Sequence, residues 1–99
     1  TGQQVIVDMG VLLGRKPSAE VPAGAKSVKL EDPTRTISRN HAAISFDQDG
    51  TLWIEDYGSL NGTYIIQDDV ETKVEHKPMQ LEAPCTVRIG DQFFQFRKQ

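Results

Sequence analysis

Apolar and polar residues alternate in short runs along the chain, and this two-residue period predicts β-strands rather than helices. The alternation is clearest at residues 27–31. Runs rich in β-branched and aromatic residues predict the other strands, at residues 4–9, 11–15, 41–47, 51–55, 62–66, 85–89 and 93–97. No window of eleven residues carries an apolar stripe at the helical spacing. We therefore expect an all-β domain.

Turn residues separate these runs at short intervals. The gap Gln48-Asp49-Gly50 predicts a hairpin, and Gly90-Asp91 predicts the last turn. Closely spaced strands with such turns are typical of a β-sandwich or a barrel. Two segments interrupt the pattern: a loop rich in Pro, Gly and Ala at residues 16–25, and a charged segment at residues 67–78 in which we expect a weak strand at 71–75.

The apolar positions of these strands supply the expected core, and each side chain contributes about 1.5–3 kcal/mol when fully buried. The expected core residues are Val5, Val7, Leu12, Val28, Leu30, Ile44, Phe46, Leu52, Trp53 or Ile54, Ile65, Leu81, Val87, Ile89, Phe94 and Phe96.

Composition narrows the class of protein. With 99 residues, 37% of them hydrophobic and 25% charged, the chain fits one soluble globular domain. Its apolar runs are far shorter than the roughly 20 residues of a membrane helix. One cysteine, Cys85, excludes an internal disulfide, and with two histidines we expect neither a metal nor a cofactor. Because the sequence begins with Thr1-Gly2 and no leader, we expect residues 1–99 to be one domain of a longer protein. A single, reduced cysteine indicates the cytoplasm, which includes the cytoplasmic part of a membrane-anchored host.

The net charge of −3 argues against binding of DNA or RNA. The charge is unevenly spread, because residues 1–44 hold six basic and four acidic side chains, whereas residues 45–99 hold five and ten. A local basic cluster in an acidic protein indicates a small anionic ligand.

Three loop motifs carry the candidate chemistry. They are Gly14-Arg15, then Ser38-x-x-His41, then Gly58-Ser59 followed by Asn61-Gly62-Thr63-Tyr64, and an Ile89-Gly90-Asp91 turn closes the series. In this order, between strand-like segments, they resemble the forkhead-associated (FHA) domain over nearly the whole chain.

The resemblance implies a two-sheet β-sandwich whose loops at one end bind a peptide containing phosphothreonine. It implies that Arg15 and Ser38 contact the phosphate, that Arg39 adds a second positive group, and that Asn61 hydrogen-bonds the peptide backbone. Thr36 and Leu60 complete the expected binding set. Gly14, His41 and Gly62 are implied to support the loops from behind.

Elementary chemistry agrees with these roles. Phosphothreonine carries a charge of about −1.5 to −2 and three strong acceptor oxygens. The arginine guanidinium offers a rigid fork of donors that matches phosphate. An asparagine amide donates and accepts at once, as an extended peptide backbone requires.

The sequence departs from the family pattern in three places. The span from Arg15 to Ser38 is longer than usual because of residues 17–25, which adjoin the expected site and either add to recognition or cover it. Leu60 stands where many members carry threonine. The Asn-Gly turn common after the Thr-Tyr strand is replaced by Gln67-Asp68-Asp69.

The leading hypothesis is a non-catalytic module that recruits its host to partners phosphorylated by a serine/threonine kinase, or to the kinase itself. We expect four loop residues to select the ligand residues that follow the phosphothreonine: Lys16, Arg35, Thr36 and Asn40. We expect basic residues among them to favour an acidic neighbour. No nucleic acid and no direct membrane contact are expected.

Two other functions compete. The same sandwich serves as a phosphorylation-independent scaffold or dimerisation domain if Tyr57 or Phe93 forms an exposed patch. An enzyme is the weakest alternative: Ser38, His41 and Asp56 are the residue types of a hydrolytic triad, but the serine lies in no Gly-x-Ser-x-Gly motif.

Overall fold

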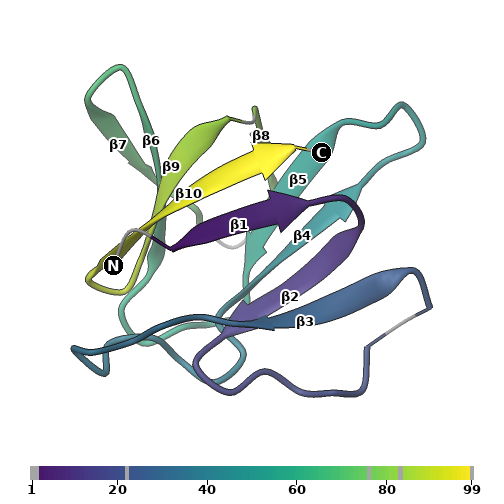
Figure 1. The fold of residues 1–99 in the computed structure, drawn as a ribbon. Helices are drawn as coiled ribbons and strands as arrows, with labels where there is room; N and C mark the ends of the chain where they lie inside the picture. Colours follow the sequence, from purple (N-terminus) through teal and green to yellow (C-terminus); the bar gives the residue numbers. More distant parts are fainter. Residues whose placement is uncertain (1–2, 22, 76, 83, 99) are drawn as a thin grey trace.

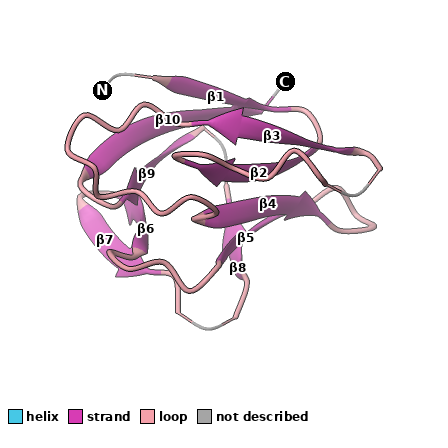
Figure 2. Ribbon diagram, turned by 90° about the horizontal axis from the view of Figure 1, so that it is seen from below, coloured by secondary structure: helices cyan, strands magenta, loops and turns pink. Residues whose placement is uncertain are grey.

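Two five-stranded sheets face each other in the computed structural model, which describes residues 3–21, 23–75, 77–82 and 84–98 (Figures 1 and 2). The first sheet has the order β1-β10-β9-β6-β7 and the second the order β3-β2-β4-β5-β8. The strands are β1 (Gln4–Val7), β2 (Gly10–Gly14), β3 (Ala25–Lys29), β4 (Ala42–Phe46), β5 (Leu52–Asp56), β6 (Thr63–Gln67), β7 (Val70–Lys73), β8 (Met79–Leu81), β9 (Cys85–Ile89) and β10 (Gln92–Lys98). This architecture confirms the expected all-β sandwich.

Most neighbouring strands are antiparallel, and β1–β10 and β2–β3 are parallel. The predicted hairpin at residues 48–50 joins β4 to β5, with Ile44 opposite Ile54. Among the described residues, no helix is long and apolar enough to cross a bilayer. Of the segments singled out in the sequence, Thr1-Gly2, Pro22 and His76 lie outside the described residues.

The core lies between the sheets, where every second residue of each inner strand is buried. Phe94 and Phe96 of β10 are fully buried and meet Ile44 and Ile54 of the other sheet within one apolar cluster. Most of the expected core residues belong to this cluster, and Val28 and Phe46 pack against it while half-buried. Of the pair Trp53 and Ile54, Ile54 is the buried one.

The expectation for β2 was wrong by one residue. Val11 and Leu13 are buried, and Leu12 lies half-exposed on the outer face. Three consecutive apolar residues do not reveal which face each occupies, since the strand period only fixes that neighbours point to opposite sides. Pairing with β4, which sets Val11 opposite Ile44, decides the phase.

Several strand boundaries differ from expectation by one or two residues. The strand expected at residues 71–75 is β7, shifted to Val70–Lys73, and the one expected at residues 27–31 is β3, at Ala25–Lys29. The sequence did not predict β8, because three residues are too few to establish an alternating pattern. Its pairing with β5, Leu81 opposite Leu52, makes it a strand.

The turn that replaces the family's second Asn-Gly is a two-residue hairpin between β6 and β7. Asp68 and Asp69 both have positive φ, 51° and 62°, as a type I′ turn requires. Aspartate tolerates this conformation less well than glycine, so the hairpin retains backbone strain.

We expect Asp69→Gly to raise the free energy of unfolding by about 0.5–1 kcal/mol, because glycine adopts positive φ without a steric penalty. Urea unfolding followed by Trp53 fluorescence measures this. Asp49→Gly is the matched control: Asp49 lies in the β4–β5 loop without positive φ, so the same substitution there should destabilise the fold. Equal effects at both positions contradict the assignment of strain to the β6–β7 turn.

Candidate functional site

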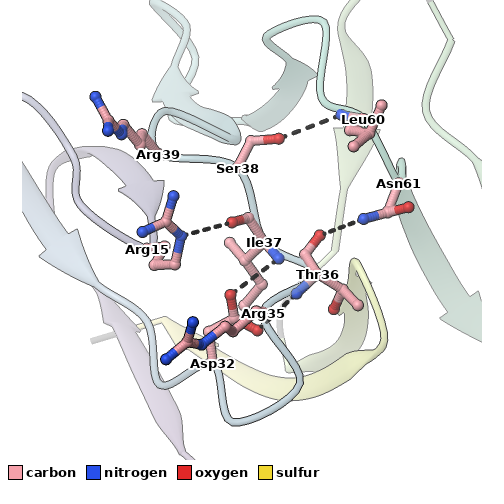
Figure 3. A pocket seen from close by; sticks show the side chains of 9 residues that line it. All are labelled: Arg15, Asp32, Arg35, Thr36, Ile37, Ser38, Arg39, Leu60 and Asn61. Carbon is pink, nitrogen blue, oxygen red and sulfur yellow. Dashed lines mark hydrogen bonds between the residues drawn. The ribbon is translucent and has the colours of Figure 1, made fainter.

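Loops from three parts of the chain meet at one end of the sandwich, at the lower left of Figure 1. There they form a hollow that we call the arginine pocket. Its lining comprises Arg15, Asp32, Arg35, Thr36, Ile37, Ser38, Arg39, Leu60 and Asn61 (Figure 3). The structure thus brings together all six residues that the sequence proposed for peptide binding.

Backbone hydrogen bonds hold the end of β2 against the β3–β4 loop. The Arg15 amide donates to the Ser38 carbonyl at 3.0 Å, and the Arg15 Nε donates to the Ile37 carbonyl at 3.3 Å. The two terminal guanidinium nitrogens of Arg15 remain directed into the pocket (Figure 3). Gly14 permits this approach, since a Cβ on it would lie 1.7 Å from the Arg39 carbonyl oxygen.

His41 is completely buried directly behind the pocket. Its Nδ1 accepts the Ser38 backbone N–H at 3.0 Å, and its Nε2 lies 2.8 Å from the Gly62 carbonyl oxygen. Because Nδ1 is an acceptor, the proton of the neutral ring sits on Nε2 and is donated to Gly62. The imidazole therefore joins the β3–β4 loop to the β5–β6 loop.

Burial lowers the pKa of His41 below its ordinary value of 6.5, against the opposing effects of the Gly62 hydrogen bond and of Asp56 and Asp32. The neutral ring is also the form that this geometry needs, since a proton on Nδ1 would displace the Ser38 N–H.

The β5–β6 loop is held by Asp56 and Ser59. One Asp56 oxygen accepts from the hydroxyls of Ser59 and Thr63, each at 2.6 Å, and the other accepts from the Ser59 amide at 2.9 Å. Burial would raise the pKa of Asp56, but these hydrogen bonds and nearby His41 outweigh it and hold the pKa below its usual range. The Ser59 hydroxyl in turn accepts the N–H of Gly62, whose φ is +86°.

Asp32 holds the β3–β4 loop in the same way. Its two carboxylate oxygens accept the backbone N–H groups of Thr36 and Ile37, at 3.0 and 3.1 Å. Asp32 is not among the site residues expected from the sequence. The signal was present, because Asp-Pro is typical of a turn in which the aspartate side chain bonds amides further along the chain.

The polar side chains at the pocket's rim use some of their hydrogen-bonding groups within the protein and leave others available to a ligand. The Ser38 hydroxyl accepts the Leu60 amide at 3.2 Å, which leaves its own proton available to a ligand. Asn61 donates one amide hydrogen to the Thr36 carbonyl at 2.8 Å, which leaves its carbonyl oxygen and second hydrogen free to meet a peptide backbone. Leu60 is 89% exposed, an apolar side chain with no protein packing to explain its position.

Positive charge dominates the pocket. Arg15, Arg35 and Arg39 are exposed, and within the described part of the chain none of them forms an ion pair with a carboxylate. The one acidic lining residue, Asp32, is engaged by backbone amides. An anion entering the pocket therefore meets unneutralised guanidinium groups on a chain whose net charge is −3.

None of the described residues of the 17–25 loop lines this pocket. Three of them, Ser18, Glu20 and Val21, line a separate hollow over the outer face of β2 and β4. Asn40, a candidate for selecting flanking residues, accepts the Ser18 amide at 2.9 Å and so holds that loop. Neither Asn40 nor Lys16 lines the arginine pocket.

The geometry does not support a hydrolytic triad. Both ring nitrogens of His41 are bonded to backbone groups, so neither is positioned to take a proton from the Ser38 hydroxyl. The Nε2 of His41 lies 3.9 Å from Asp56, beyond hydrogen-bond distance. The pocket instead presents hydrogen-bond donors that suit an anion.

Comparison with known proteins gives a consistent result. Residues 11–90 match the family described as FHA domain. The FHA domain of the CT664 protein from Chlamydia trachomatis is 27% identical, with a TM-score of 0.59 over 85% of this chain and 70% of that chain. The MEK1 FHA domain is 25% identical, with a TM-score of 0.55 over 89% of this chain and 69% of that one. A structure from an analysis of phosphothreonine-dependent FHA domain interactions is 22% identical and shows the same fold, with a TM-score of 0.56 over 88% and 74%.

We expect the free energy of unfolding to fall as the pH drops below 6.5. The unfolded chain takes up a proton on His41 near pH 6.5, whereas the folded chain resists it, so the unfolded state binds more protons and gains stability on acidification. The slope approaches about 1.4 kcal/mol per pH unit for one proton. Urea unfolding between pH 7.5 and 5 measures it.

The control is His41→Gln, which should lose this slope. Nuclear magnetic resonance titration of the His41 ring gives the folded-state pKa directly. A midpoint at or above 6.5 contradicts the prediction.

Proposed function

The chain belongs to the FHA domain family, and from this premise we propose that the arginine pocket binds a phosphothreonine-containing peptide. One observation carries the proposal: three guanidinium groups that form no ion pair with a described residue meet the Ser38 hydroxyl at one end of an acidic domain. A structure of the same fold comes from work on phosphothreonine-dependent FHA domain interactions.

Each pocket residue receives a distinct role in the proposal. Arg15 presents its two free terminal nitrogens to the phosphate, and Ser38 donates its hydroxyl proton to a phosphate oxygen. Arg39, adjacent to Ser38, adds a second cation. Such charge-assisted hydrogen bonds contribute roughly 1.5–3 kcal/mol each, so two or three of them support a micromolar affinity of about −8 kcal/mol after the cost of association.

Specificity for a peptide comes from the neighbouring β5–β6 loop. Asn61 is held by its bond to the Thr36 carbonyl, and its free carbonyl oxygen and amide hydrogen fix the register of an extended ligand. The exposed Leu60 side chain gives the ligand an apolar contact where a hydroxyl is common in the family. Gly14, His41 and Gly62 position these groups without touching the ligand.

On this proposal the domain is a non-catalytic adaptor. It brings its host protein to partners that a serine/threonine kinase has phosphorylated, or to the kinase itself. Phosphate is bound and not cleaved, because the pocket holds the phosphate-binding donors but no base in reach of the Ser38 hydroxyl.

We expect Arg15→Ala to weaken binding of a phosphothreonine peptide roughly ten- to a hundredfold and Ser38→Ala about tenfold, because each removes a charge-assisted hydrogen bond. Fluorescence anisotropy with labelled peptides from an oriented library measures the affinity. Arg97→Gln removes an exposed charge from the outer face of β10 and should leave the affinity unchanged.

Equal binding of the phosphorylated and unphosphorylated peptides would overturn the proposal. If a partner still binds the Arg15→Ala, Ser38→Ala double variant, the phosphorylation-independent scaffold is favoured instead. Phe93 and Tyr57, 49% and 53% exposed, are then the first surface residues to substitute.

A further inference from the structure

β7 is the most exposed of the four strands that form the sheet edges. It lies at the outer flank of its sheet, pairs with β6 alone among the described strands, and has all four residues exposed (Figures 1 and 2). By contrast, β8 has three residues and begins directly after Pro78. The Gln3 side chain, directly before β1, donates to the Lys29 carbonyl and accepts the Glu31 amide, which ties β1 to the end of β3. An exposed edge strand such as β7 is able to pair with a strand of another chain.

The pairing with β6 fixes which backbone groups of β7 point outward. In an antiparallel pair, residues whose N–H and C=O bond the neighbouring strand alternate with residues whose groups point away from it. The Val74 N–H donates to the Thr63 carbonyl at 2.8 Å, so position 74 bonds β6, and Thr72, two residues earlier, shares its phase. The N–H and C=O groups of Glu71 and Lys73 are therefore directed at the free edge.

Two copies of β7 have one register in which these groups pair without opposing like charges. A twofold axis makes the pairing antiparallel and sets outward-directed residues opposite one another. Within β7, that leaves Glu71 opposite Glu71 of the second copy, Lys73 opposite Lys73, or Glu71 opposite Lys73. The first two registers oppose like charges, which is destabilising, whereas the third forms two pairs of opposite charge. In the third register the axis passes through Thr72, and the outward N–H and C=O groups of both residues find partners.

The side chains on this edge suit the third register. Both Glu71 carboxylate oxygens accept from Arg88, at 2.6 and 3.1 Å, and the Arg88 guanidinium carbon lies 4.0 Å from the centre of the Tyr64 ring. These contacts hold Glu71 on the outer face of the sheet. Lys73, two residues further on, shares that face and forms no ion pair with a described residue. Pairing with a second copy places a lysine beside Glu71, on the side away from Arg88.

The charges of β7 also limit which strands it accepts. Charged side chains on an edge usually discourage pairing with foreign strands. In β7 they disfavour the two like-charge registers and an apolar strand, but they complement a second β7. Because only a short strand from each copy takes part, we expect a Kd on the order of 0.1–1 mM.

We propose that β7 is a self-association edge, at which two copies of this chain pair about a twofold axis at Thr72 and join their β7-containing sheets into one continuous sheet. No residue that lines the arginine pocket lies in β7, so both pockets stay open in the dimer. Because the two strands run antiparallel, the pockets face opposite ends of the dimer. This inference does not depend on what the arginine pocket binds.

Sedimentation velocity between about 0.05 and 2 mM tests for the dimer, which should appear with the Kd given above. Exchange of amide hydrogens with water, followed by nuclear magnetic resonance, locates the pairing. The N–H groups of Glu71 and Lys73 should exchange about twofold to sevenfold more slowly at the highest concentration than at the lowest, because that share of the chain is then paired. The Thr72 N–H, which bonds β6, should be protected at every concentration.

Charge-swapped variants test the register. Glu71→Lys and Lys73→Glu each oppose like charges in a homodimer, and each should raise the Kd at least about tenfold. Mixed in equal amounts, the two variants should form a heterodimer, because every introduced charge then meets its opposite. Arg97→Gln changes the net charge away from β7 and should leave the Kd unchanged. Thermal unfolding shows whether each variant is folded.

A second pair of variants separates the backbone from the charge. Lys73→Pro removes an outward N–H and keeps the bonds to β6, so it should abolish the dimer. Lys73→Gln keeps that N–H and loses only the charge, so it should raise the Kd about threefold.

A chain that stays monomeric at about 2 mM overturns the proposal and leaves the β7 edge to a strand of a different protein. A dimer that persists in Lys73→Pro also overturns it and assigns self-association to another surface. The same holds if the Glu71 and Lys73 amides exchange equally fast at all concentrations, or if the charge-swapped variants do not pair on mixing.

Discussion

The buried imidazole of His41 is the contact on which the geometry of the pocket depends. It accepts from the Ser38 amide with one nitrogen and donates to the Gly62 carbonyl with the other, so one ring joins the β3–β4 loop to the β5–β6 loop. A neutral ring with a single tautomer satisfies both partners, and burial keeps it neutral. Any side chain unable to do both would leave a buried backbone group without a partner, which is costly away from water.

Two aspartates extend this arrangement into the loops. Asp32 organises the backbone ahead of Ser38, and Asp56 organises the backbone ahead of Gly62. In both cases the carboxylate oxygens accept hydrogen bonds from loop amides, which lie outside the strand pairing. The carboxylates of Asp32 and Asp56 are therefore engaged by the loops, whereas the pocket's arginines stay exposed, and this division gives an acidic protein a basic pocket.

The sandwich contributes rigidity to the site. Arg15 follows the last residue of β2, and Ser38 and Asn61 each lie within four residues of a strand. Groups this close to a strand end, over a closely packed core, have little freedom to move apart. In the longer loop, Ser18, Glu20 and Val21 lie over the outer face of β2 and β4, where Asn40 accepts the Ser18 amide.

Alternation and turn residues in the sequence determined the strands and the all-β class, because a period of two and glycine-containing gaps are local properties. The motif residues Arg15, Ser38, His41 and Asn61 could also be selected from sequence. The face of Leu12 and the existence of β8 were decided only by pairing with neighbouring strands. The pocket, too, was decided by tertiary structure. Asp32, Arg35 and Leu60 come together because the β3–β4 and β5–β6 loops meet in space. No local pattern specifies the distance between groups so far apart along the chain.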